Sequence, residues 1–256
     1  MNESTRPYLV SIVVVSKDNY KDLQRTISSI FYALDNDLPI EIIVIDGSNH
    51  PEKFSNKIPR GMNLTYLQES DAGIFSAMNK GMFLAKGRFI WFLNSGDILP
   101  KDINLISLLG QLKSNNWLVG NAMKEYRSIG RIQNWKIPKK RNLKLYFAIQ
   151  SFPHQSTIYR TDLLVSQSGF NESSPVADWE TSLKFLLQNS PKILPATLSI
   201  CEGGGNSSKL GILVKTRSQV LGRKEIYGFG GIRFTVEYFI QLLINLVIYL
   251  KYNKFS

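Results

Sequence analysis

The sequence predicts an α/β fold in which helices flank a mostly parallel sheet. Over about the first hundred residues, short apolar runs alternate with segments of helical periodicity, which is the pattern of parallel strands joined by crossover helices. The runs are apolar and β-branched at successive positions, as expected of strands buried on both faces. Acidic residues follow several of these runs, and in a parallel sheet the ligand lies beyond the carboxyl ends of the strands.

Four strands and two helices are expected in this first part. The strands are residues 10–15 (VSIVVV), 39–45 (PIEIIVI), 64–67 and 89–93 (FIWFL). Leu23, Ile27 and Ile30 share one helical face with two later apolar residues, which predicts a helix between the first two strands. A second helix is predicted over residues 74–85, ended by Gly87.

The second part is less regular. We expect a basic, proline-containing linker at residues 136–144, a strand at 156–159, a helix at 178–187 and a glycine-rich loop at 203–208. Residues 234–250 are strongly apolar, but Glu237, Gln241 and Asn245 recur every four positions and would form a polar stripe on a helix. These 17 residues are too few and too polar for a spanning helix. An interfacial helix with basic flanks fits better, and a terminal helix packed on the domain's own core is the alternative.

Composition and charge exclude several classes of protein. A hydrophobic fraction of 43% excludes a disordered chain, and the single cysteine, Cys201, excludes an internal disulfide and a cysteine-based metal cluster. Residues 1–100 hold 10 basic and 11 acidic side chains, whereas residues 101–256 hold 21 and 9. The basic part would attract phosphates or anionic lipid, but without an interleaved aromatic motif nucleic acid is not expected. No secretory signal opens the chain, so a cytoplasmic location is expected.

Residues 69–97 are the most informative segment for chemistry. Asp71 lies just past the third predicted strand, and Asp97 lies in the glycine-containing turn after the fourth. Two carboxylates brought to one site can hold a divalent cation, which can in turn hold a diphosphate. Each acid alone is more often a turn former or a helix cap than a ligand, but acids at successive strand ends favour a shared site.

Seven blocks of sequence carry a family resemblance. They are SIVVVS near the start, VIDGSN at 44–49, ESDAGIFSAMNKG at 69–81, GRFIWFLNSGD at 87–97, PHQSTIYR at 153–160, ADWE at 177–180 and EGGGNSS at 202–208. With these blocks in the family's order, the chain resembles the family 2 glycosyltransferases of the GT-A fold. It is most similar to the subgroup of colanic-acid and other exopolysaccharide synthesis. The resemblance implies transfer of a sugar from a nucleoside diphosphate to a hydroxyl group.

The resemblance also implies roles at the donor site. Ser16 and Asp18 lie where such enzymes close over the nucleotide base, Asp46 matches the acid that hydrogen-bonds the base, and Asp71 matches an acid that helps to frame the nucleotide. Lys17 departs from the family pattern, because many members carry an aromatic residue there that stacks on the base.

The metal-binding segment of the family matches residues 94–97. Asn94 belongs to the donor site, and Asp97 aligns with the final acid of the segment, which implies Asp97 as the ligand of Mn²⁺ or Mg²⁺. Asn94 and Gly96 stand where the fuller motif carries acids, so metal binding is expected to depend on the diphosphate as well. One or two carboxylates together with substrate phosphates are a common set of ligands for magnesium.

Asp178 matches the catalytic base of inverting members of the family, and a plain helix-capping role is the alternative. Trp179 follows it and could line an acceptor pocket. His154 and Gln155 could contact the donor diphosphate, the acceptor or the metal, and a purely structural histidine is an equally good interpretation.

These roles predict the organisation of the chain. Residues 1–100 would bind the nucleotide sugar, residues 101–225 would form the acceptor-binding half of the same domain, and residues 226–256 would form an amphipathic, membrane-associated tail. A polyprenyl-diphosphate-linked saccharide acceptor would explain a peripheral position on the inner face of the cytoplasmic membrane, in bacterial surface polysaccharide biosynthesis.

Two other functions are open on the sequence alone. A nucleotidyltransferase would use a similar sheet and metal, but the segment SKDNYKDL after the first strand has no glycine with which to build a phosphate loop. A non-catalytic nucleotide-sugar-binding protein, or a scaffold of a membrane polysaccharide complex, is compatible with the reduced metal motif. Turnover of a nucleotide sugar would distinguish the enzyme from the binding protein.

Overall fold

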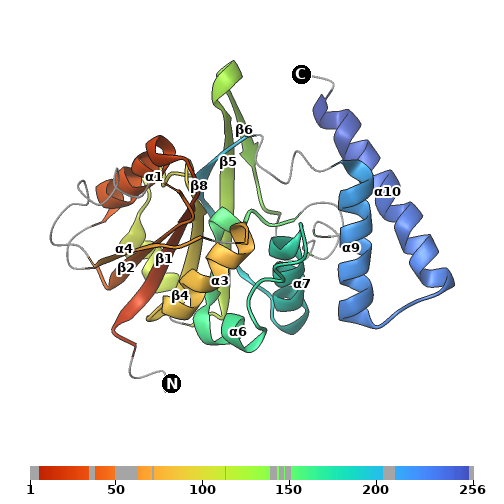
Figure 1. Ribbon diagram of the computed structural model, residues 1–256, viewed down its shortest axis with the longest axis horizontal. Coiled ribbons are helices and arrows are strands. Elements are labelled where there is room, and N and C mark those ends of the chain that lie inside the picture. The colour runs from red at the N-terminus through yellow and green to blue at the C-terminus, as the bar shows by residue number, and fades with distance from the viewer. Residues whose placement is uncertain are drawn as a thin grey trace.

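The computed structural model of the chain contains one eight-stranded mixed sheet, with helices on both faces and a helical hairpin at one end (Figure 1). The structure describes residues 6–34, 38–49, 63–70, 72–112, 114–138, 143, 147, 151–203 and 211–253. The strand order is β3-β2-β1-β4-β7-β5-β6, and β8 pairs with β5. The predicted α/β fold with a mostly parallel sheet is confirmed.

The parallel part of the sheet comes from the first hundred residues. β1 (Tyr8–Ser16) lies between β2 (Ile40–Asp46) and β4 (Gly87–Asn94), and β3 (Leu64–Gln68) pairs with β2 at the edge of the sheet. In register, Ser16 lies beside Asp46, which lies beside Gln68. The polar residues that end these strands therefore lie side by side, at the carboxyl ends of the parallel strands.

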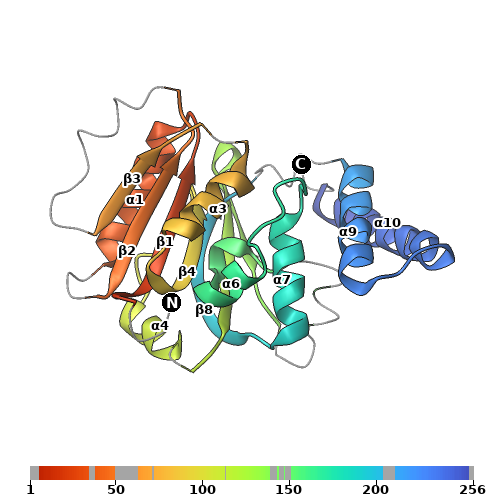
Figure 2. The ribbon, with the colours of Figure 1, turned by 60° about the horizontal axis from the view of Figure 1, so that its bottom comes forward.

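Two layers of helices cover this sheet. α1 (Tyr20–Ala33) and α4 (Leu105–Leu112) pack on one face, and α3 (Ile74–Leu84), α6 (Thr161–Ser166) and α7 (Ala177–Gln188) pack on the other (Figures 1 and 2). Val13 and Val15 of β1 join the apolar cluster under α3, whereas Ile12 and Val14 join the cluster under α1. Burial on both faces explains why the strands are apolar at successive positions.

The remainder of the sheet is mixed. It consists of β5 (Trp117–Tyr126), β6 (Arg131–Trp135), β7 (Thr157–Arg160) and β8 (Lys192–Glu202). β7 runs antiparallel to both β4 and β5 and so joins the two parts of the sheet, while β8 runs parallel to β5 with a register shift near Asn121. Two short 3₁₀ helices matter for the site: η2 (Arg127–Ile129) follows β5, and η4 (His154–Ser156) precedes β7.

The chain ends in an antiparallel hairpin of α9 (Ile212–Tyr227) and α10 (Ile232–Asn253), at the end of the molecule away from β2 and β3 (Figure 2). α9 packs on α7, and α10 packs on α9. The predicted polar stripe does not face solvent. Asn245 donates to Thr216 Oγ1 at 2.9 Å and to Gln219 Oε1 at 3.0 Å, so the stripe lies in the seam between the two helices.

The outer surface of the hairpin is apolar. Phe239, Leu243 and Val247 of α10 are each more than half exposed, at 59%, 63% and 64%. α10 thus packs on α9 rather than on the sheet. The expected association of this helix with a membrane surface stays a prediction. Among the helices that the structure describes, none is long and apolar enough to cross a membrane.

Candidate active site

Asp46 ends β2 and is held there by hydroxyl and amide groups. The Ser48 N–H donates to Asp46 Oδ1 at 3.0 Å, the Ser48 hydroxyl donates to the same oxygen, and the Tyr66 hydroxyl donates to Oδ2 at 2.6 Å. Burial, together with this contact to Asp46, raises the pKa of Tyr66 well above its usual value. The carboxylate is therefore fixed in orientation, and both of its oxygens are already engaged.

The loops after β1 and β2 are tied to each other through Asp18. Its N–H donates to Ser48 Oγ at 2.7 Å, and its Oδ1 accepts from the Asn49 N–H at 3.2 Å. Its backbone lies in the left-handed region, with φ at 49°, which aspartate tolerates better than most residues. Ser16, the last residue of β1, is buried, and its hydroxyl has no hydrogen-bond partner among the described residues. Ser16, Asp18 and Asp46 thus surround the ends of two adjacent strands.

Asp97 lies in the turn that follows β4 and is only 2% exposed. Its Oδ2 accepts from the Asn94 N–H at 2.7 Å, and its Oδ1 accepts from the Glu202 N–H at 3.4 Å. Burial raises the pKa of Asp97 to about 6, although His154 and these amides act in the opposite direction. Gly96 supplies the φ of 100° that the turn requires.

A chain of polar contacts runs from this turn to α7. Asn94 Nδ2 lies 3.2 Å from His154 Nε2, and His154 Nδ1 lies 3.4 Å from Asp178 Oδ2. When Asn94 donates to Nε2, neutral His154 carries its proton on Nδ1, directed at Asp178. Gln155, next in η4, bonds to Asp97 through its side chain. β4, η4 and α7 are far apart in sequence, and their polar side chains meet here.

Asp178 lies in the first turn of α7, and its side chain is 22% exposed. Burial acts to raise the pKa of Asp178, but the hydrogen bond and electrostatic attraction of His154 and two backbone N–H groups outweigh it, so the pKa lies below its ordinary value. The carboxylate is therefore ionised at neutral pH and still reachable. Both properties suit a proton acceptor.

One predicted site residue is placed differently from the rest. Trp179 is only 4% exposed. Its ring stacks on Phe147 at a centroid distance of 5.6 Å, and the Arg223 guanidinium lies 5.7 Å from its centre. The ring is thus part of the core. The sequence had instead suggested that Trp179 could line an acceptor pocket. Asp71 lies outside the described residues.

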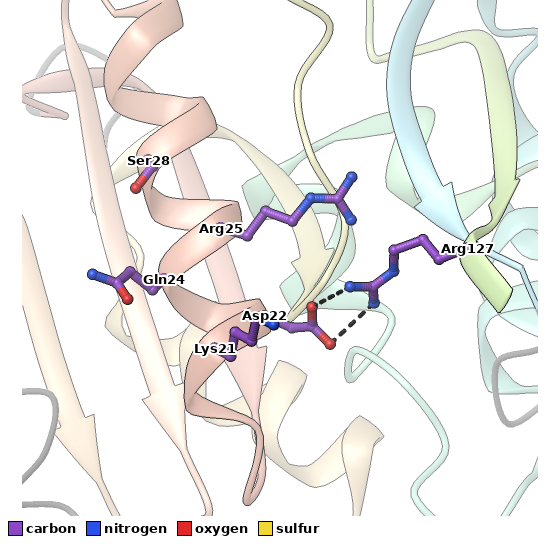
Figure 3. Close-up of a pocket in the computed structure, with 6 residues that line it drawn as sticks. All are labelled: Lys21, Asp22, Gln24, Arg25, Ser28 and Arg127. Carbon is purple, nitrogen blue, oxygen red and sulfur yellow. Dashed lines mark hydrogen bonds and ion pairs between the residues drawn. The ribbon is translucent and has the colours of Figure 1, made fainter. Parts of the chain in front are cut away.

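An ion-pair network beside Gly96 was not expected from the sequence. Arg127 of η2 donates to both oxygens of Asp22 in α1, at 2.6 and 3.0 Å (Figure 3). Arg127 also pairs with Glu202 at the end of β8, at 2.6 Å. The hydrogen bond from Arg127 holds the pKa of Asp22 below its usual value against the effect of burial. Asp22 and Arg127 are 105 positions apart, so no local pattern could reveal the pair.

A pocket of about 330 Å³ lies over this network, lined by Lys21, Asp22, Gln24, Arg25, Ser28 and Arg127 (Figure 3). None of its lining residues belongs to the predicted site. The network instead joins α1, η2 and β8. It lies against the turn that carries Asp97, since a Cβ at Gly96 of that turn would be 3.1 Å from Glu202 Oε2.

Comparison with known families decides the relationship. The family model described as glycosyl transferase family 2 matches residues 11–165. The chain belongs to this family. This glycosyltransferase is 27% identical over 242 residues to the uncharacterized glycosyltransferase MT1564 of Mycobacterium tuberculosis (strain CDC 1551 / Oshkosh), covering 90% of this chain and 89% of the relative. The same values hold for Rv1514c of strain H37Rv.

Solved structures with less than 20% sequence identity share the fold. S. aureus TarS, residues 1–349, in complex with UDP-GlcNAc has a TM-score of 0.67 and 18% identity, over 95% of this glycosyltransferase and 73% of that chain. The mannosyltransferase PcManGT from Pyrobaculum calidifontis, in complex with GDP-Man and Mn²⁺, has a TM-score of 0.61 and 14% identity, over 97% and 76%. These neighbours support the GT-A fold. The comparisons do not distinguish the exopolysaccharide subgroup from others.

Oxygen atoms suited to a divalent cation lie in the turn after β4. The part of the chain that the structure describes holds no cluster of three or more His, Cys, Asp or Glu side chains arranged for a metal. Asn94 Oδ1, however, is a buried oxygen with no hydrogen-bond partner among those residues, and such an atom costs about 1–3 kcal/mol. Asn94 Oδ1 and the Asp97 carboxylate fit a site that relies on substrate phosphates for its other ligands.

Proposed function

We propose that this glycosyltransferase moves a sugar from a nucleoside diphosphate to a hydroxyl group of a saccharide acceptor, with inversion. The observation that carries the proposal is the chain of contacts from Asp97 through Asn94 and His154 to Asp178. These contacts connect the turn after β4, which is suited to a cation, with the ionised carboxylate of Asp178. UDP-GlcNAc in TarS, and GDP-Man with Mn²⁺ in PcManGT, support a nucleotide-sugar donor and Mn²⁺ or Mg²⁺ as the cation.

Each residue of the site would have a defined part in this reaction. The acceptor oxygen attacks the anomeric carbon as its bond to the diphosphate breaks, and Asp178 takes the proton from the attacking hydroxyl. The Nδ1–H of His154 orients the Asp178 carboxylate. A bound divalent cation would stabilise the charge of the leaving diphosphate. Asp97 and Asn94 would hold this cation.

The other predicted residues would bind the nucleotide or support the base. Ser16 has a buried hydroxyl that is available to a ligand, and Asp18 and Asp46 hold the adjoining loops. Asp71 would contribute to the same nucleotide site. Gln155 would position Asp97, and Trp179 would support the first turn of α7 rather than contact the acceptor.

The acceptor would be linked to a polyprenyl diphosphate at the inner face of the cytoplasmic membrane, in surface polysaccharide biosynthesis. The exposed apolar side chains of α10 support a peripheral position on lipid. Arg217, Lys224 and Arg233 lie on the same hairpin and would add attraction to anionic head groups, worth about 1 kcal/mol for each residue near the surface. Residues 1–100 would bind the donor, and residues 101–225 would bind the acceptor.

A panel of UDP- and GDP-sugars, incubated with the full chain and Mn²⁺, tests the proposal through release of the nucleoside diphosphate. We expect one donor to be turned over, faster with a saccharide acceptor present, and nuclear magnetic resonance of the product should show an inverted anomeric centre. Retention of configuration would contradict the single displacement. Tight binding of a nucleotide sugar without turnover would instead support the non-catalytic binding protein, which the single carboxylate of the metal turn favours as a second candidate.

A further inference from the structure

Two lysine side chains have no part in the mechanism above, and one of them, Lys215, is close enough to Asp178 to interact with it electrostatically. Lys215 is in the first turn of α9, and Lys124 is near the end of β5, paired in register with Cys201 of β8. Both side chains are half-buried. Lys215 interacts electrostatically with Asp178 and with Lys124. Lys215 is therefore within electrostatic range of both Asp178 and Lys124.

The packing of α9 on α7 determines where Lys215 lies. Gly222 of α9 approaches Glu180 of α7 so closely that a Cβ on Gly222 would lie 2.8 Å from Glu180 Oε1. The Arg223 guanidinium lies 5.7 Å from the centre of the Trp179 ring. Lys215 precedes Gly222 by seven residues, or about two helical turns, so the two share a face of α9. That face is directed at the helix that carries Asp178.

Neither lysine has a close carboxylate partner among the described residues, although Asp178 attracts Lys215 electrostatically. Among the ion pairs of the described residues, none includes Lys124 or Lys215. The Lys124 ammonium lies 4.1 Å from the centre of the Trp135 ring. Burial lowers the pKa of both lysines, and the charge of Lys215 lowers that of Lys124 further. Two half-buried cations that repel each other would be stabilised by an anion bound between them.

The apolar surface of the hairpin begins beside Lys215. Leu213 and Val214, adjacent to Lys215 in sequence, are 62% and 51% exposed. The contact between Thr216 and Asn245 brings the second half of α10 alongside, and there Leu243 and Val247 are exposed. Within one turn, α9 therefore presents a cation toward Asp178 and apolar side chains to the outside.

We propose that Lys124 and Lys215 bind the phosphate groups of the acceptor, whose lipid chain lies on the apolar surface of α9 and α10. This inference rests on the proposed function and specifies the acceptor side of that site. Phosphate oxygens accept charge-assisted hydrogen bonds from ammonium groups, and a sugar attached to the bound phosphate would lie next to Asp178. The donor diphosphate has the same chemistry, so the experiment must separate these two sources.

Calorimetric titration of the full chain with farnesyl diphosphate tests the inference, in EDTA so that no cation bridges the ligand to Asp97. Lys215→Met and Lys124→Met should each weaken binding by about tenfold or more, a factor that corresponds to about 1.4 kcal/mol. Lys215→Arg keeps the charge and should bind nearly as well as the wild type. Lys86→Met is the matched control, because Lys86 is an exposed lysine just before the amino end of β4. Farnesol, which has no phosphate, should bind to the wild type and to all of the variants with similar affinity.

The affinity for UDP and GDP, measured on the same preparations, separates the sources. We expect the methionine variants to change the nucleotide affinity by less than about twofold. The two lysines would contact the phosphate groups of the acceptor and not those of the donor. If these variants weaken nucleotide binding and leave farnesyl diphosphate unaffected, the lysines belong to the donor and the inference is wrong. An equal loss of farnesyl diphosphate affinity in Lys86→Met would show that the effect reflects only the overall charge of the protein. That result would also overturn the inference. Lysine-dependent binding of farnesyl diphosphate without turnover of any nucleotide sugar would contradict the proposed function and leave the phosphate site standing.

Discussion

Asp178 differs from an ordinary aspartate in a first helical turn because of one partner. An acid at this position is favoured by the helix dipole alone, so its place on α7 carries little functional information. The contact with His154 at 3.4 Å lowers its pKa and fixes one of its oxygens, while 22% of its side chain stays exposed. His154 is in turn connected to Asn94 in the metal turn. The histidine therefore acts as the link between the two halves of the proposed reaction.

The Asp178→Asn variant should lose turnover and keep donor binding. An amide cannot take the proton of the acceptor hydroxyl, and the loss of a general base lowers the rate by about 100- to 10,000-fold. Steady-state release of the nucleoside diphosphate gives kcat, and calorimetry gives the donor dissociation constant. Asp162→Asn is the control, since Asp162 on α6 pairs with Arg160 and lies outside the predicted site. Similar rates for wild type and Asp178→Asn would refute the assignment.

Asp97 should give the stability of the protein a characteristic pH dependence. Its pKa of about 6 lies above the ordinary value of 3.8, so the folded protein holds this proton more tightly than the unfolded chain. The resulting stabilisation is fully present below pH 3.8 and is lost as the pH rises through about 6. Relative to Asp97→Asn, which cannot ionise, the wild type should lose about 3 kcal/mol of unfolding free energy over this window.

Denaturant unfolding of both proteins at about pH 4 and pH 7.5, in EDTA, measures this difference. Repeating the pH 7.5 experiment with Mn²⁺ and a nucleoside diphosphate should restore part of the loss in the wild type only, because a cation favours the charged carboxylate. A wild-type-to-variant difference that is independent of pH would show that the Asp97 carboxylate is not buried as described.

At the scale of elements, the sequence predicted the parallel part of the sheet well and the mixed part poorly. The runs at β1, β2 and β4 are apolar throughout because both faces are covered. β5 is continuously buried only over its first four residues, and β8 contains Pro195 and exposed positions, so neither has the pattern of a buried strand. α9 has almost no apolar face, because its buried side includes Thr216 and Gln219.

The site was predictable only in part, for a related reason. Acids at the ends of parallel strands meet because the sheet dictates it, and Asp46 and Asp97 could be found in this way. His154 and Asp178 meet across η4 and α7, where no periodicity reports the geometry. The buried side of Trp179 likewise depends on Phe147 and on Arg223 from α9, an element that the sequence pattern did not reveal.

Removal of the Arg127 side chain should loosen the connection between η2, α1 and β8. Arg127→Met breaks three hydrogen-bonded contacts with Asp22 and Glu202 at the edge of the turn that holds Asp97. Because the partners are partly exposed, we expect a loss of only about 1 kcal/mol in unfolding free energy, but a higher KM for the donor. Arg131→Met is the control, since Arg131 lies over the Tyr126 ring in the neighbouring strand. Equal KM values in all three proteins would argue against a role in holding the site.

The polar seam of the hairpin should control how α10 is held. Asn245→Ala removes the donors to Thr216 and Gln219 and the acceptor for Gln241. Unsatisfied buried groups cost about 1–3 kcal/mol, so amide hydrogen exchange in α10 should accelerate while exchange in β1 and β4 stays unchanged. Leu246→Ala, on the exposed face, should change exchange in α10 much less. Uniform acceleration throughout the chain would mean that the hairpin does not open separately from the sheet.

For the whole molecule, the asymmetric distribution of apolar surface predicts membrane association. The double variant Phe239→Ser, Leu243→Ser should reduce co-sedimentation with phosphatidylglycerol-rich vesicles by tenfold or more, because burial of each large apolar side chain is worth about 1.5–3 kcal/mol. The control Phe83→Ser, Ile106→Ser alters side chains that are equally exposed, at 70% and 66%, but lie on α3 and α4. Equal sedimentation of the two variants, or none for the wild type, would contradict the lipid-facing hairpin.

The seam between α9 and α10 also selects one rotation of α9 about its own axis. Apolar side chains alone would let the two helices slide or roll past each other at small cost, since many arrangements bury similar area. Thr216 and Gln219 can meet Asn245 in only one register, and a slip of one turn would separate all of them at once. Lys215 directly precedes Thr216, so the same register also fixes the position of Lys215 on α9. The side-chain hydrogen bonds of Asn245 thus also fix the rotation of the helix that carries Lys215.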